Sequence, residues 1–381
     1  MQAARSTEAD NDFSGDNQGG QAPGSNRSDA KSGPQSNDIP DDMEQAFPDP
    51  IFRAYVLQHF DTDGDGRISQ EEALAVTSID INVSKVDEAP EEEKITSLEG
   101  VQYFINLTYL DCSTHRLASL DVSHNTALEV LRCPDNDLTS LDVSQNTALT
   151  SLSCGHNQLT SLDISQHTKL ELLWCYDNQL TSLDVSQNAV LESLRCDDNQ
   201  LTSLDVSQNT ALTSLSCGHN QLTSLDVSQH TELVELSCSY NQLTSLDVSR
   251  NTALRFLSCG HNQLTNLDVS QNTGLKMLHC SNNQLASLDV SQNTALSLFS
   301  CDGNKLTNLD VSHNADLITL QCRKNQLTSL NVSRNKNLYS LYCTMSTLET
   351  LTLKNGQKIH GINEGRDAYY VSPKTAIEYV D

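Results

Sequence analysis

The sequence contains no apolar run of 18 residues and few basic side chains, and each absence excludes a class of function. Without such a run, no segment is expected to span a membrane as a helix. Only 23 lysine and arginine residues stand against 50 acidic residues, which gives a formal net charge of -27. Because this charge repels phosphate groups, we expect neither a nucleic acid nor an anionic membrane as a partner.

The short motifs of common enzyme chemistries are also absent. The sequence has no Gly-x-Ser-x-Gly nucleophile turn, no glycine-rich phosphate loop and no His-Glu-x-x-His zinc motif. We therefore predict a protein that is not an enzyme. Residues 1–8 lack the apolar core of a secretion signal, and no sortase-type anchor is visible. These features therefore do not decide in which cellular compartment the protein acts.

The most regular feature of the sequence is a repeat. All twelve cysteines, from Cys112 to Cys343, follow one another at a constant spacing of 21 residues. The unit that begins at Leu212 has apolar residues at positions 1, 4, 6, 11, 14 and 16, and an asparagine at position 9. This pattern is typical of leucine-rich repeats. We predict an α/β solenoid, a right-handed leucine-rich repeat superhelix with a parallel sheet on its concave face.

The repeat also predicts where the side chains point. Alternate residues of a strand share a face, so Leu215 and Cys217 are expected to face the core while the serines beside them face outward. Asn220 follows the strand and is expected to bond backbone groups that the strand leaves free. Thiols stacked about 4.8 Å apart on neighbouring strands are poorly placed for disulfides. We expect them to remain reduced and to fill the core as small apolar groups.

A second pattern precedes the repeats. Residues 61–72 match the calcium-binding loop of an EF-hand at every ligand position. Carboxylates that converge on one point repel one another unless a cation joins them. We therefore predict a Ca²⁺ site that stiffens an amino-terminal cap, with a degenerate, metal-free loop as the alternative. The expected ligands are Asp61, Asp63, Asp65, Arg67 (through its carbonyl), Ser69 (through water) and Glu72.

Composition divides the chain into four parts. Residues 1–46 are rich in small polar residues and are expected to form a disordered tail. Residues 47–94 are expected to form a helical, EF-hand-like cap, in which Asp49 caps the first helix. Residues 95–348 hold the repeats, and residues 349–381 are expected to cap the other end of the array, because a repeat without a neighbour exposes its core.

Two details of the helical cap are also predicted. The helix expected over residues 70–77 should turn Ala73, Leu74 and Val76 toward the repeats. The acidic stretch 88–93 should form an exposed loop.

The segment from Leu98 to Leu110 resembles the opening repeat of the internalin family of bacterial surface proteins. The 21-residue unit with one cysteine is similar to the cysteine-ladder branch of that family, and the resemblance covers about residues 49–350. It implies a surface-exposed or secreted bacterial recognition module. The repeat pattern is far more specific for the fold than for the ligand.

Recognition is expected at the outward strand positions, which vary while the core positions repeat. Units three to eight mostly carry serine or glycine there, but the fourth unit carries the only tryptophan of the chain, with charged residues on both sides. Tryptophan and arginine are typical of binding hot spots; the alternative is a solvated aromatic residue without a partner. The predicted ligand-binding residues are Arg132, Leu172, Trp174, Tyr176, Asp177, Arg195, Asp197, Tyr240 and Phe256.

Together these features favour a monomeric module that binds a protein or a glycan, outside the cell or on the bacterial surface. The alternatives are a structural spacer, an accessory domain of a secreted enzyme or toxin, and a binder of crystal surfaces such as ice. The last of these rests on a parallel row of threonines that begins with Thr139, Thr160 and Thr181. Repetition alone also produces such a row.

Overall fold

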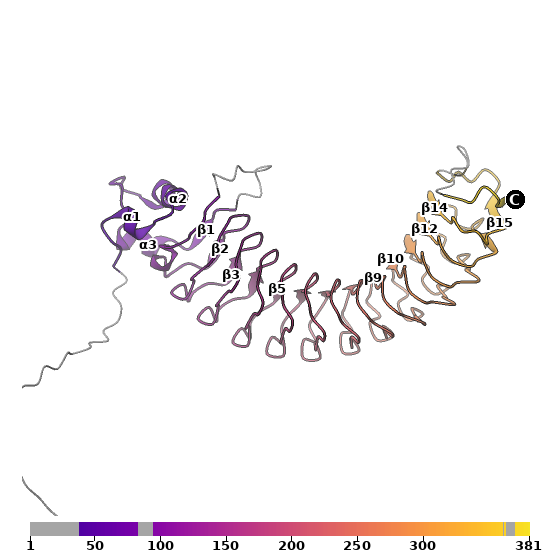
Figure 1. Cartoon of the computed structure of the whole chain (residues 1–381), viewed down its shortest axis with the longest axis horizontal. Helices are drawn as coiled ribbons and strands as arrows, with labels where there is room; N and C mark the ends of the chain where they lie inside the picture. Colours follow the sequence, from indigo (N-terminus) through magenta and orange to yellow (C-terminus); the bar gives the residue numbers. More distant parts are fainter. Residues whose placement is uncertain (1–37, 83–93, 361, 363–369) are drawn as a thin grey trace, which may run out of the picture. The chain divides into compact units, whose positions relative to one another are not determined.

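The computed structural model describes residues 38–82, 94–360, 362 and 370–381. Most of the expected tail, the acidic stretch 88–93 and part of the carboxyl-terminal cap lie outside the described residues. Between residues 38 and 381, coils of chain follow one another along an arc, and the labelled strands other than β15 lie on its inner side (Figure 1). This is the leucine-rich repeat solenoid that the spacing predicted.

One parallel sheet of 13 strands runs through the coils in the order β1-β2-β3-β4-β5-β6-β7-β8-β9-β10-β11-β12-β14. Except for the first pair, neighbouring strands pair one repeat apart, as Ser193 pairs with Ser214. The sheet therefore places equivalent positions of successive units side by side. The strands are β1 (Ser78–Asp80), β2 (Tyr109–Asp111), β3 (Val130–Arg132), β4 (Ser151–Ser153), β5 (Leu172–Trp174), β6 (Ser193–Arg195), β7 (Ser214–Ser216), β8 (Glu235–Ser237), β9 (Phe256–Ser258), β10 (Met277–His279), β11 (Leu298–Ser300), β12 (Thr319–Gln321) and β14 (Ser340–Tyr342).

A second, three-stranded sheet closes the carboxyl end of the array. It consists of β13 (Ser329–Asn331), β15 (Thr350–Lys354) and β16 (Ala376–Val380), all parallel. The backbone N–H of Cys343 donates to the carbonyl of Tyr370 at 2.8 Å. Residues near the end of the chain therefore satisfy backbone groups of the last repeat, which has no further coil to pair with.

In the described residues 38–82, three short helices precede the repeats: α1 (Met43–Ala46), α2 (Pro50–Phe60) and α3 (Gln70–Ala75). A one-turn 3₁₀ helix, η2 (Val101–Tyr103), follows in the first coil. Asp49 caps α2 as predicted, since its Oδ1 accepts hydrogen bonds from the first turn of the helix at 2.9 and 3.0 Å.

The second oxygen of Asp49 joins the helical cap to the first coil. Its Oδ2 accepts hydrogen bonds from the backbone N–H and the hydroxyl of Thr96 at 2.9 and 3.0 Å. Burial alone would raise the pKa of Asp49, but the hydrogen bonds from Thr96, Phe52 and Ile51 outweigh it and lower the pKa. The carboxylate is therefore ionised at neutral pH and bonds both segments.

Two expectations about the helical cap are wrong. Residues 43–46 form a helix instead of belonging to the tail, because Phe47 directly after them is buried against Phe52 and Phe104, at ring-centroid distances of 5.8 and 5.9 Å. A helix of four residues is too short to show a periodic pattern in the sequence. In α3, Leu74 is 38% exposed, because the neighbouring Ala73 and the cap residue Val76 take the buried side.

The cysteine ladder lies in the core as predicted. All twelve thiols are free, and all twelve side chains are fully buried. Burial raises the pKa of every one of them, to about 12 for Cys154, Cys280 and Cys343. The reactive thiolate is therefore strongly disfavoured at neutral pH.

The asparagine at position 9 satisfies the backbone of two coils at once. Asn220 Nδ2 donates to the carbonyls of Cys196 at 3.0 Å, Cys217 at 3.2 Å and Gly218 at 3.0 Å. Its Oδ1 accepts from the backbone N–H of Leu201 at 2.9 Å. Units on either side repeat this arrangement, which confirms the predicted role of this residue.

A second row of buried side chains, at position 19, was not predicted. Asn209 is fully buried, and its Nδ2 donates to the carbonyls of Val185 at 2.9 Å and Asn188 at 2.8 Å in the preceding coil. Each of the first eleven units carries Asn or His at this position, and that regularity was the signal in the sequence. The row consists of Asn125, Asn146, His167, Asn188, Asn209, His230, Asn251, Asn272, Asn293, Asn314 and Asn335.

Candidate functional site

The only tryptophan of the chain lies on the concave sheet, at the end of β5. Trp174 is half-buried, and its Nε1 donates a hydrogen bond to Ser193 Oγ in β6 at 3.2 Å. The guanidinium carbon of Arg195 lies 5.6 Å from the centroid of the Trp174 ring and 4.5 Å from that of Tyr176. These cation–π contacts join side chains of two neighbouring coils. We call this group the Trp174 cluster (Trp174, Tyr176 and Arg195).

Asp197 lies beside the Trp174 cluster. Its Oδ1 is 3.6 Å from Arg195 Nε, too far for a hydrogen bond, and this buried oxygen has no hydrogen-bond partner among the described residues. The side chain is only 15% exposed, although the sequence placed it on the outward face. Burial raises the pKa of the nearby Tyr176, so its phenol is neutral at physiological pH.

Two hollows of the concave sheet border the Trp174 cluster. Trp174 and Tyr176 line the first hollow, of about 390 Å³, and Arg195 lines the second, of about 430 Å³. Predicted site residues Arg132 and Leu172 line the first hollow as well. The second hollow extends from Arg195 past serine hydroxyls to larger side chains on β9 and β10, and it is lined in part by Ser216, Ser237, Ser258, Phe256, Met277 and His279.

The structure places the remaining predicted residues around this centre. Arg132, at the end of β3, lies over the ring of Tyr109 at 5.7 Å. Phe256, at the start of β9, is 38% exposed. Asp177 has a left-handed backbone (φ 49°), and its Oδ2 lies 2.5 Å from His156 Nδ1. The predicted residues therefore share the concave face and its rim.

Tyr240 belongs to a different group on the rim. Its ring is stacked between those of His219 and His261, with centroid distances of 4.0 and 3.9 Å. The phenol ring of Tyr240 therefore lies between the two imidazoles. The sequence did not reveal the stack, because the three rings come from three successive coils.

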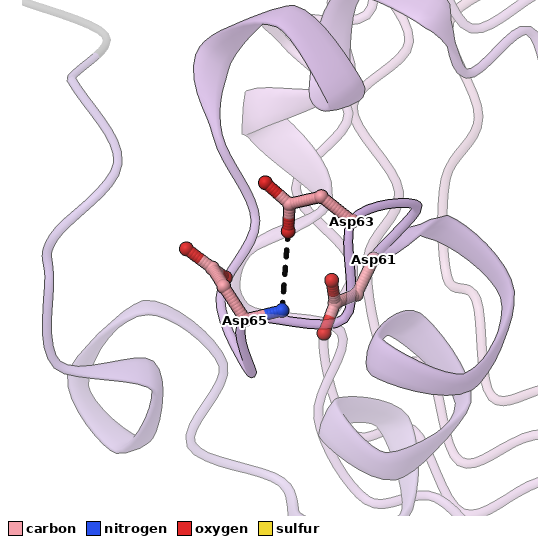
Figure 2. Close-up of side chains that lie close together, drawn as sticks. All are labelled: Asp61, Asp63 and Asp65. Atoms are coloured by element: carbon pink, nitrogen blue, oxygen red, sulfur yellow. Dashed lines mark hydrogen bonds between the residues drawn. The ribbon is translucent and has the colours of Figure 1, made fainter.

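The expected calcium loop brings three carboxylates together. Oxygen atoms of Asp61, Asp63 and Asp65 all lie within 4.8 Å of one another, and Figure 2 shows the three side chains around the same turn of the loop. Asp61 accepts hydrogen bonds from the backbone N–H groups of Gly64 at 2.7 Å and Gly66 at 2.8 Å. The left-handed backbone of Gly66 (φ 81°) permits this tight turn.

The fourth expected carboxylate, Glu72, is not part of that group of three. Its Oε1 accepts from the backbone and hydroxyl of Thr62 at 2.6 and 2.7 Å, and its Oε2 accepts from the backbone and hydroxyl of Ser69, both at 2.9 Å. Hydrogen bonds from Ser69 and Thr62 outweigh burial and lower the pKa of Glu72 to about 2. Glu72 is therefore ionised at neutral pH and lies against the loop.

Two comparisons give no match, since neither protein-family models nor curated proteins match the sequence. The solved structures do match. The functional domain of InlJ from Listeria monocytogenes, which includes a cysteine ladder, is 36% identical with a TM-score of 0.77, over 89% of this chain and 70% of that domain. The chain belongs to the internalin family.

Other structures share the fold of this internalin-like protein. InlF of Listeria monocytogenes is 22% identical, with a TM-score of 0.69 over 88% of this chain and 96% of InlF. The plant peptide hormone receptor RGFR1, solved in complex with RGF2, is 18% identical, with a TM-score of 0.62 over 82% of this chain and 58% of the receptor. The fold is thus that of a leucine-rich repeat solenoid. Within the described residues, no helix is long and apolar enough to cross a membrane.

Proposed function

We propose that this internalin-like chain is an extracellular recognition module that binds a protein partner through its concave face, with the Trp174 cluster at the centre of the contact. One observation carries the proposal: the single tryptophan is half exposed and packed against Arg195, between strands β4 and β7, which carry only serine at their outward positions. Tryptophan and arginine are enriched among the residues that dominate binding energies. The two hollows beside them offer space for side chains of a partner.

Replacing Trp174 with alanine tests this proposal. We expect Trp174→Ala to weaken the binding of a protein partner by about 30-fold or more, because a central aromatic anchor contributes at least about 2 kcal/mol. Partners are first selected with the wild-type chain from a displayed library of extracellular protein domains. Their dissociation constants are then measured by biolayer interferometry.

The matched control is Tyr379→Ala, which removes an exposed aromatic side chain from β16 in the other sheet. This variant should bind like the wild type. If Trp174→Ala binds every selected domain as tightly as the wild type does, the Trp174 cluster is not the binding site. If the chain binds glycans and none of the displayed protein domains, the proposal of a protein partner is rejected.

We also propose that the loop at residues 61–72 binds Ca²⁺. The three neighbouring aspartates and the ionised Glu72 supply the hard oxygen donors that this ion prefers, and the turn at Gly66 has the required backbone. Asp61, Asp63, Asp65 and Glu72 would hold the ion, with the Arg67 carbonyl and Ser69 completing its shell. Bound Ca²⁺ would cancel the repulsion among the carboxylates and stabilise the helical cap.

A further inference from the structure

Three arginines of the concave face lie over aromatic rings, but their hydrogen bonding differs. Arg323 is 5.2 Å from the ring of Tyr342, and its Nε and Nη2 both donate to Asp302 Oδ2, at 2.9 and 2.7 Å. Arg132 Nη1 donates to the hydroxyl of Tyr109 at 3.4 Å. Within the described residues, the guanidinium of Arg195 makes no hydrogen bond, and its nearest carboxylate oxygen lies at 3.6 Å.

The aromatic rings beside Arg195 hold its guanidinium in place without accepting hydrogen bonds from its N–H groups. The rings of Trp174 and Tyr176 lie 5.6 and 4.5 Å from its central carbon, and Asp197 Oδ1 lies 3.6 Å from its Nε. A guanidinium has five N–H groups in one plane, and stacking on aromatic rings leaves these groups available at its edge. The two terminal amino groups of Arg195 therefore have no acceptor in the described part of the chain, although its side chain is only 41% exposed.

Arg195 also forms one boundary of the larger hollow between β6 and β10. That hollow is lined by Ser216, Ser237, Ser258 and the acidic Glu235, together with Phe256 from β9 and Met277 from β10. A ligand that reaches from Arg195 across the hollow would meet first hydrogen-bonding groups and then apolar side chains. Phenylalanine and the adaptable methionine suit apolar side chains of a peptide.

We propose that Arg195 binds the carboxylate of an aspartate or glutamate of the protein partner, whose neighbouring apolar side chains occupy the hollow toward Phe256 and Met277. The inference rests on the proposed function and names the chemistry of the contact. A carboxylate matches the planar fork of a guanidinium with two parallel, charge-assisted hydrogen bonds. Within this chain, Arg323 shows that such a guanidinium pairs with a carboxylate, although there Nε and Nη2 both donate to the single oxygen Oδ2 of Asp302.

The test uses a random peptide library displayed on phage and selected on the full wild-type chain at about 0.15 M salt, where charges beyond about 8 Å are screened. We expect the selected peptides to share an acidic residue next to apolar residues. Labelled versions of these peptides, and the same peptides with the acid changed to its amide, are then titrated with each variant, and fluorescence anisotropy gives the dissociation constants.

We expect Arg195→Gln, and the amide peptide with the wild-type chain, each to bind about 10- to 100-fold more weakly. Combining both changes should add little further loss, because both remove the same contact. Arg195→Lys keeps the charge without the planar fork, so its affinity should lie between those of the wild type and Arg195→Gln. Arg250→Gln, an exposed arginine beyond the concave sheet, removes the same charge and should bind like the wild type. Circular dichroism and thermal melting verify that each variant is folded.

Three results would overturn the inference. The first is that the selected peptides lack an acidic residue, and the second is that Arg195→Gln binds them as tightly as the wild type does. The third such result is a peptide library that yields no binder while oligosaccharides with carboxylates do bind the chain. Trp174→Ala separates this failure from failure of the proposed function. If Trp174→Ala loses binding while Arg195→Gln and the amide peptide do not, only the carboxylate contact is rejected. If both variants bind like the wild type, the concave site itself is rejected.

Discussion

Replacing Asn220 with alanine is expected to lower the free energy of unfolding by about 2–5 kcal/mol. The side chain bonds the backbone N–H of Leu201 and the carbonyls of Cys196, Cys217 and Gly218. Alanine cannot reach these groups, and the space left beneath the turn is closed to solvent, so buried polar atoms lose their partners. Urea unfolding followed by circular dichroism measures the change.

The matched control for this prediction is Asn266→Ala. Asn266 is exposed, so its replacement should change the free energy of unfolding by no more than about 0.5 kcal/mol. Because a solenoid is stabilised by contacts between neighbouring units, the damage at Asn220 should also uncouple the two halves of the array and broaden its unfolding transition. Equal effects of the two substitutions would contradict the structural role of the buried asparagine.

Removing Ca²⁺ is expected to lower the melting temperature of the helical cap by about 5–10 °C. An ion present at about 100 times its dissociation constant stabilises the folded state by about 2.7 kcal/mol, and each kcal/mol corresponds to a few degrees for a domain of this size. Differential scanning calorimetry of the wild type with Ca²⁺ and with EDTA measures the shift. Asp61→Ala should melt at the same temperature in both buffers, because it removes a carboxylate of the proposed site.

Glu71→Ala provides the control for the calcium experiment. Glu71 is an exposed residue of α3 next to Glu72, but it does not occupy a ligand position of the loop. Its replacement removes one negative charge from the same region, and the variant should keep the full shift between Ca²⁺ and EDTA. If the wild type melts at one temperature in both buffers, the loop holds no structural ion.

The repeats could be predicted in detail because each apolar position recurs at a fixed spacing. Positions 4 and 6 predicted the buried Leu215 and Cys217, and position 9 predicted the bonding of Asn220. Position 19 was equally regular, but its polar side chains were not recognised as buried. The hydropathy of Asn209 gave no sign that its amide would bond carbonyls of the preceding coil.

The details of the candidate site depend on side-chain conformation, which a repeat pattern does not specify. The sequence placed Trp174 and Arg195 on the same face, since both occupy position 5 of their units. It did not show that Arg195 packs against two rings, or that Asp197 is mostly covered beside it. In the helical cap, α1 and Leu74 were misjudged because short helices have too few residues for a reliable apolar pattern.

The reactivity of the cysteines in the native protein tests most directly whether the repeats form one continuous buried core. All twelve thiols are fully buried and have raised pKa values, so we expect fewer than about one per chain to react with a maleimide within an hour at pH 7. In urea all twelve should react within minutes, which mass spectrometry counts directly. Rapid labelling of most thiols without urea would contradict the buried ladder and, with it, the assignment of the concave face as the free surface.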